Sequence, residues 1–68
     1  MTTYLAFMRD MIREAREDFD MRAAPLLVEA DSSIIDFAVS VRTAIGEIST
    51  DEAIDALKRY KVGYAPSP

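Results

Sequence analysis

Hydroxyl, carboxylate and guanidinium groups are the side chains that could do chemistry in this sequence, and their use depends on the residues around them. The 68 residues include no Cys and no His. A serine or threonine nucleophile therefore has no imidazole to activate it, and a transition metal lacks its commonest ligands. Two glycines are too few for the usual phosphate-binding loop. We expect a protein that is not an enzyme and that uses neither a cofactor nor a metal.

Three carboxylates gather near residue 50, at Asp51, Glu52 and Asp55. A pair of acids can act as general acid and base when their surroundings separate their pKa values. Exposed acids in the first turn of a helix more commonly stabilise the helix dipole. We interpret the three carboxylates as the start of a helix and predict no catalytic residues.

A row of arginines, Arg9, Arg13 and Arg16, recurs at spacings of four and three residues, which places the guanidinium groups along one flank of a helix. Guanidinium groups bind carboxylates and phosphates through two hydrogen bonds, so the row could dock an acidic partner. The alternative is a solvated flank held by local ion pairs, such as Arg9 with Glu14 or Arg13 with Glu17. Both interpretations stay open, and the three arginines are candidate partner-binding residues.

A second basic group lies near the C-terminus, where Lys58, Arg59, Tyr60 and Lys61 combine cations with an aromatic ring. Such a combination can contact phosphates and stack on bases. Three positive charges are few against the roughly 6–10 phosphate contacts of an ordinary DNA-binding protein, and the chain carries a net charge of −4. Cations at the end of a helix also stabilise it directly. We predict these four residues to bind a protein partner, and we do not expect nucleic acid or a membrane.

The elements that must position these side chains are predicted to be three helices, at about residues 3–22, 26–45 and 50–62. In the first helix, apolar residues recur at spacings of three and four. Thr2 or Thr3 can cap its N-terminus. Pro25 disfavours helical dihedrals at Ala24, so the helix should end near Arg22. The apolar stripe consists of Tyr4, Met8, Met11, Ala15 and Phe19.

The start of the second helix has two interpretations. Proline is acceptable in the first turn of a helix, so Pro25 can open one long helix that runs to Ile45, and this is the prediction that we adopt. Alternatively, residues 26–30 are extended or irregular, and the helix begins only at residues 31–33. The residue pattern does not decide whether residues 26–30 are helix or strand.

Turn and capping residues mark the other boundaries. Ser33 and Asp36 have the spacing of a capping-box variant, and Ser49 and Glu52 have the spacing of a full capping box. Gly46 is a candidate for a left-handed residue that ends the second helix. The third helix is therefore the best-defined element in the sequence.

Apolar residues surround most of the second helix, which indicates that it needs partners on two sides. A chain of this length buries only about 60% of the surface that its unfolded form exposes, and no disulfide is available to stabilise it. We therefore predict a small all-α domain that self-associates as a helical homodimer. The predicted oligomer interface consists of Met8, Met11, Phe37, Val41 and Ile45.

The overall composition agrees with a folded protein. Half of the residues are hydrophobic and 29% are charged, which is too apolar for a disordered acidic tail. No apolar stretch approaches the roughly 20 residues of a membrane span, and the N-terminus lacks the pattern of a secretory signal. We expect a cytoplasmic protein with one helical domain at residues 1–63 and an extended or disordered tail at 64–68.

These features favour a non-enzymatic protein–protein interaction module that acts as a homo-oligomer. Small acidic helical proteins of this kind can be inhibitors, adaptors or antagonists of another protein, including ones encoded by mobile elements. A structural role as a scaffold or a subunit of a larger complex is a further hypothesis.

The alternative function is that of a small dimeric DNA-associated regulator or antitoxin-like protein. If residues 26–30 form a strand, the order strand, helix, helix over residues 25–62 resembles the ribbon-helix-helix arrangement. The strand of such proteins reads DNA with polar or basic side chains, whereas Leu26, Leu27, Val28, Glu29 and Ala30 provide none of the basic groups.

Overall fold

The computed structural model describes residues 3–63, which form three helices: α1 at Tyr4–Ala23, α2 at Ser32–Ala44 and α3 at Thr50–Gly63. A single 3-10 turn at Ala24–Leu26 follows α1, and the described residues include no strand, apart from an isolated bridge between Ile45 and Ile48. The predicted all-α fold with three helices is confirmed. The predicted tail at 64–68 and the alternative cap Thr2 lie outside the described residues.

The N-terminus of α1 is capped as the sequence predicts. The Thr3 side chain accepts a hydrogen bond from the backbone N–H of Ala6 at 3.1 Å, which satisfies one of the free donors of the first turn. At the other end, the helix reaches Ala23, and Ala24 keeps right-handed helical dihedrals. The bias that Pro25 places on Ala24 is therefore overridden, because the chain continues directly into the 3-10 turn.

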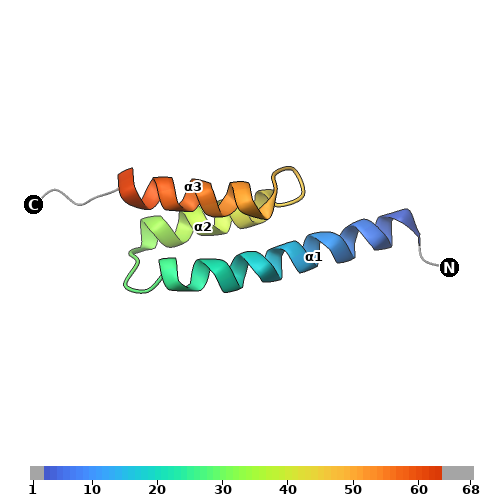
Figure 1. Ribbon diagram of the computed structural model, residues 1–68, viewed down its shortest axis with the longest axis horizontal. Coiled ribbons are helices and arrows are strands. Elements are labelled where there is room, and N and C mark those ends of the chain that lie inside the picture. The colour runs from blue at the N-terminus through green and yellow to red at the C-terminus, as the bar shows by residue number, and fades with distance from the viewer. Residues whose placement is uncertain (1–2, 64–68) are drawn as a thin grey trace, which may run out of the picture.

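The second helix is shorter than predicted, and the expectation of one helix over residues 26–45 is wrong. Leu27 ends the 3-10 turn by donating to the carbonyls of Ala23 and Ala24, and Glu29 then takes a positive φ of 61°. This turn reverses the chain, so that α2 runs back along α1 (Figure 1). The reversal occupies residues 27–31, so α2 begins only at Ser32.

Asp31 marks the start of α2, since its side chain accepts a hydrogen bond from the N–H of Ile34 at 3.1 Å. This agrees with the alternative in which the helix begins at residues 31–33, although the predicted pair Ser33 and Asp36 does not provide the cap. Residues 26–30 are neither a regular α-helix nor a strand.

The loop between α2 and α3 contains the predicted turn and capping residues. Gly46 has a φ of +116°, which an L side chain rarely adopts. Ser49 and Glu52 form a reciprocal capping box, in which the Glu52 N–H donates to Ser49 Oγ at 3.1 Å and the Ser49 N–H donates to Glu52 Oε1 at 3.2 Å.

The core lies where the three helices meet, with Phe19 and Leu57 as its largest fully buried side chains. Packing is most extensive between α2 and α3, then between α1 and α3, and least between α1 and α2. The other buried residues are Ala23, Ile34, Ala38, Ile45, Ala53 and Ile54.

The helices differ in length, and this difference gives the molecule its shape. At 1.5 Å per residue, the 20 residues of α1 extend about 30 Å, whereas α2 and α3 extend about 20 Å. The N-terminal part of α1 therefore projects beyond the α2–α3 pair (Figure 1). Among the described residues, no helix is long and apolar enough to cross a membrane.

Candidate interaction surface on the first helix

Residues 4–11 of α1, which we call the arm, hold the largest group of exposed apolar side chains among the described residues. Between 37% and 74% of the surface of each of these side chains is exposed. They are Tyr4, Leu5, Phe7, Met8 and Met11. Monomeric soluble proteins rarely expose contiguous apolar patches of this kind unless the patch binds something.

The edge of the core explains why the arm is exposed. Ile12 is half-buried and lies against the loop at Gly46, where a Cβ would come within 3.1 Å of the Ile12 Cδ1 atom. From Ile12 toward the N-terminus, only Ala6 is half-buried and every other described residue is exposed. The α2–α3 loop therefore ends the cover over α1 at about residue 12.

The apolar face of the arm is wide. Successive residues of a helix are rotated by about 100°, so the five side chains from Phe7 round to Leu5 span an arc of about 160°. Met8 lies on the same side of α1 as Ile12 and Phe19, at helical spacing. The apolar face of the arm thus continues the face that is buried in the rest of α1, and it is wider than that face on one side.

The arginine row on α1 is divided between two uses. Arg16 donates to the carbonyl oxygens of Arg42 at 3.1 Å and Thr43 at 3.0 Å, and so binds carbonyl groups at the C-terminal end of α2. Arg13 forms an ion pair with Asp10 at 3.3 Å, in place of the expected pair with Glu17. Arg16 thus has a structural role within the chain, and Arg13 belongs to a solvated ion pair.

Arg9 differs from the other two arginines, because it makes no hydrogen bond or ion pair with residues 3–63. The three arginines line a surface recess of about 500 Å³ together with Ala6 and Ile12. Arg9 is therefore the member of the row whose guanidinium group is not engaged by any residue within 3–63.

The basic group on α3 is mostly engaged within the chain. The ring of Tyr60 stacks on Phe37 with the ring centroids 4.2 Å apart, and its hydroxyl shares a hydrogen bond with Ser33. Lys61 Nζ donates to the Leu26 carbonyl at 2.8 Å. These contacts join α3 to α2 and to the turn after α1.

The remaining charges of α3 are exposed. Arg59 pairs with Asp55 at 3.2 Å, and Lys58 is exposed. Asp51 accepts a hydrogen bond from Arg22 at 2.7 Å, and this bond raises the pKa of the Arg22 guanidinium. The three carboxylates near residue 50 thus cap or brace helices, and no group of three or more acids within residues 3–63 could hold a metal ion.

The predicted oligomer interface is brought together only in part. Met8 and Met11 lie exposed on the arm, whereas Phe37 and Val41 are half-buried against the chain's own core. Ile45 is 4% exposed and belongs to that core, so it offers almost no surface to a second copy. Most of the wide apolar arc of α2 is covered by α1 and α3.

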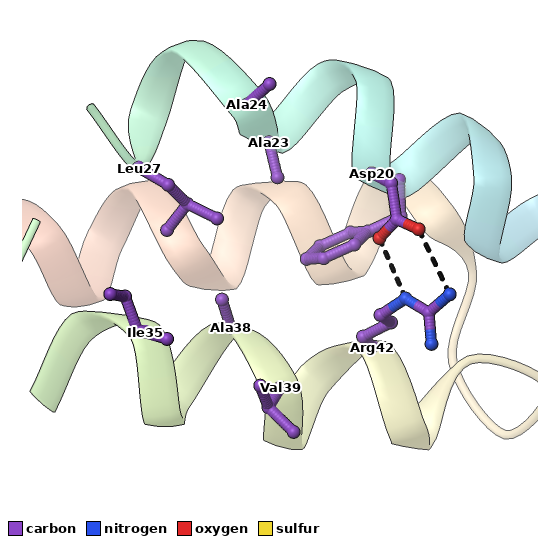
Figure 2. Close-up of a pocket in the computed structure, with 9 residues that line it drawn as sticks. Asp20, Ala23, Ala24, Leu27, Ile35, Ala38, Val39 and Arg42 are labelled. Atoms are coloured by element: carbon purple, nitrogen blue, oxygen red, sulfur yellow. Dashed lines mark hydrogen bonds and ion pairs between the residues drawn. The ribbon is translucent and has the colours of Figure 1, made fainter. Parts of the chain in front are cut away.

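A groove between α1 and α2 was not expected from the sequence. Its volume is about 290 Å³. Figure 2 shows Ala23, Ala24 and Leu27 on one side and Ile35, Ala38 and Val39 on the other. The sequence signal that could have indicated the groove is the small side chains at residues 23, 24 and 38, which leave space where two helices face each other.

An ion pair closes one end of the groove. Arg42 Nε donates to Asp20 Oδ1 at 2.7 Å, and Arg42 Nη2 donates to Oδ2 at 3.0 Å (Figure 2). These hydrogen bonds raise the pKa of the Arg42 guanidinium above its ordinary value. The bidentate geometry fixes the Asp20 and Arg42 side chains across the groove, so α1 and α2 are held together there without being packed along their length.

The arm and the groove are the two apolar surfaces from which a function can be inferred. No protein-family model matches the chain, and no curated protein and no solved structure matches it significantly.

Proposed function

We propose that the chain is a non-enzymatic protein–protein interaction module that acts as a homo-oligomer, with the arm as its self-association surface. The observation that carries this proposal is the apolar face of residues 4–11, which no residue within 3–63 covers. As an oligomer, the module would act as an inhibitor, adaptor or antagonist of another protein.

The energetics of exposure support a contact surface at the arm. Covering a Leu, Phe or Met side chain fully is worth about 1.5–3 kcal/mol, and the arm exposes Leu5, Phe7, Met8 and Met11 together. Methionine adapts to irregular surfaces, and aromatic rings give a large contact area for little loss of side-chain entropy. The arm thus has the composition that protein interfaces favour.

The helical order of the arm also supports this role. Tyr4, Phe7, Met8 and Met11 stand at positions i, i+3, i+4 and i+7, which is the spacing of the anchors with which an amphipathic helix binds a groove. Arg9, which has no partner within residues 3–63, lies next to Leu5 at one edge of the apolar arc, since the two are four residues apart. A charged residue at the rim of an apolar contact contributes to specificity and to the rate of association.

The alternative of a ribbon-helix-helix regulator has no observation in its favour. The resemblance depends on a strand at residues 26–30, and those residues form the 3-10 turn and the reversal before α2. We therefore do not propose DNA binding.

Light scattering coupled to size exclusion, over a range of protein concentrations, tests the proposed function. We expect the mass of the unmodified chain to rise above that of a monomer, and we expect Met11→Asp to stay monomeric with unchanged helicity. Met21→Asp is the matched control, since Met21 lies on the same helix and is 77% exposed outside the arm.

The control should associate as the unmodified chain does. An unmodified chain that remains monomeric at every concentration would contradict the proposal, and so would an equal loss of association in the two variants.

A further inference from the structure

We propose that the groove between α1 and α2 is the docking site for the arm of a second copy of this chain. This inference rests on the proposed function, because it names the surface that covers the arm. Each copy has one arm and one groove, so a single type of contact would cover both apolar surfaces.

The lengths of the two surfaces agree. Tyr4 and Met11 are seven positions apart, which corresponds to about 10 Å along a helix. The groove runs along α2 from Ile35 to Arg42, which are again seven positions and about 10 Å apart. The arm therefore fills the groove from its open end to the Asp20–Arg42 ion pair.

The shapes of the side chains are complementary. The arm presents large side chains, namely Tyr4, Phe7, Met8 and Met11. Three alanines, at residues 23, 24 and 38, leave the floor of the groove open. Large side chains on one helix pack well against small ones on its neighbour, because the ridges of one enter the grooves of the other.

The width of the arm's apolar face favours a groove over a single helix. An arc of about 160° is wider than the stripe of roughly 100° that one packed face requires. Pairing two arms face to face would leave Phe7 and Leu5 at the two exposed edges of each arm. A groove has two walls, one from α1 and one from α2, and covers both edges.

Charges beside the two surfaces are complementary. The lining of the groove holds one acid and one base, Asp20 and Arg42, which pair with each other. The neighbouring segment, residues 27–41, contains Glu29, Asp31 and Asp36 and no basic residue. The flank of the arm carries Arg9, which has no partner within residues 3–63, whereas Arg13 is already paired with Asp10. Complementary charges at the rim of an apolar contact speed association and disfavour other arrangements.

The rim of the groove is accessible to such a partner. Ile35 is 44% exposed and Val39 is 56% exposed, and the two lie one turn apart on α2. These two side chains are the part of the wide apolar arc of α2 that the chain's own core leaves uncovered. Val39 can be replaced by a charged residue with little effect on the core, because more than half of its surface is in water.

A mixing experiment tests the inference. Met11→Asp disables the arm and leaves the groove intact, whereas Val39→Asp disables the groove and leaves the arm intact. We expect each variant to be monomeric alone, by light scattering, at concentrations where the unmodified chain associates. An equal mixture should regain a mass above that of a monomer, because the arm of the Val39→Asp chain can dock in the groove of the Met11→Asp chain.

Two controls make this result specific. Ser40→Asp places the same charge one residue along α2, on a side that does not line the groove, and should associate as the unmodified chain does. The double variant with Met11→Asp and Val39→Asp has neither surface, so mixing it with either single variant should leave both monomeric. Circular dichroism of every variant should show unchanged helicity.

The outcomes separate the inference from the proposed function. If Val39→Asp associates normally while Met11→Asp does not, the arm is the self-association surface but its receptor is not the groove, and the inference is overturned. A mixture that stays monomeric overturns it equally. If Met11→Asp associates normally, the proposed function fails first.

Discussion

The two halves of α1 share one apolar face and have opposite surroundings. Phe19, in the second half, is 2% exposed, whereas Phe7, in the arm, is 55% exposed. Both are aromatic residues on the apolar side of one continuous helix. The difference arises because α2 and α3 are about 10 Å shorter than α1, so that the cover ends at the loop beside Ile12.

An amphipathic pattern defines the apolar face of a helix, but it does not define which residues cover that face. The spacing of apolar residues identifies which side chains gain free energy from burial. Whether the cover comes from the same chain depends on the lengths of the other helices and on where their loop turns. Substitutions in each half of α1 test whether the two halves differ as the packing implies.

The largest expected difference is between the two phenylalanines. Phe19→Ala should cost about 3–5 kcal/mol of folding free energy, which is close to the whole stability of a domain of this size, so most of the helicity should be lost. Phe7→Ala should change the stability of the monomer by less than about 0.5 kcal/mol. Urea unfolding followed by circular dichroism, at concentrations below those of association, measures both.

Phe19→Leu provides a milder change in the packed half, so that an unfolding transition remains to be fitted. Equal destabilisation of the monomer by Phe7→Ala and Phe19→Leu would contradict the proposed difference between the two halves, since the arm would then be part of the folded core.

The second prediction applies the same comparison to the arginine row. Arg16→Ala removes two hydrogen bonds to the carbonyls at the end of α2 and should cost about 1–2 kcal/mol. Arg9→Ala is the matched control on the arm and should leave the thermal midpoint of the monomer almost unchanged. Equal midpoints for the two variants would show that Arg16 does not hold α2 to α1.

The third prediction concerns the loop that ends the cover over α1. Ser49→Ala removes one half of the capping box at the start of α3 and should cost about 1 kcal/mol. Ser32→Ala, at the first residue of α2, is the control and should cost less. It removes a hydroxyl that makes no hydrogen bond within residues 3–63. A loss as large in Ser32→Ala as in Ser49→Ala would contradict the assigned cap.

The smallest expected effect is that of a charge change beside the arm. Arg13 and Asp10 are both more than half exposed, and surface ion pairs contribute less than about 1 kcal/mol. Arg13→Glu should therefore keep the helicity and the unfolding midpoint of the monomer nearly unchanged. A large loss of structure would mean that this flank of α1 is packed rather than solvated.

The sequence predicted those parts of the fold that depend on local signals. The three helices, the cap at Thr3 and the capping box of Ser49 and Glu52 are each formed by residues within a few positions of one another. The adopted start of α2 was wrong, and the alternative start at residues 31–33 was right. The choice depends on a chain reversal at Glu29, where the positive φ belongs to a residue type that gives no turn signal.

The candidate surfaces were predicted less completely, because burial depends on packing between distant residues. Met8 and Met11 are exposed, as an interface requires, but Ile45 is covered by residues that its own helical pattern does not reveal. Tyr60 could not be assigned from its basic neighbours, since its ring is held by Phe37, which is 23 positions away. The groove lies between α1 and α2, and its three alanines, at residues 23, 24 and 38, indicate a groove only once it is known that the two helices face each other.

The stack of Tyr60 on Phe37 gives the molecule an internal optical probe. The chain has no Trp, so its near-ultraviolet spectrum comes mainly from tyrosine. Tyr60 is held rigidly between two helices, whereas Tyr4 is 74% exposed on the arm. An ordered ring gives a strong near-ultraviolet circular dichroism band, and an exposed phenol is readily quenched by a solute such as iodide. Once Tyr64, the third tyrosine of the chain, is replaced by Phe, the two rings allow the folding of the core and the covering of the arm to be followed separately without a label.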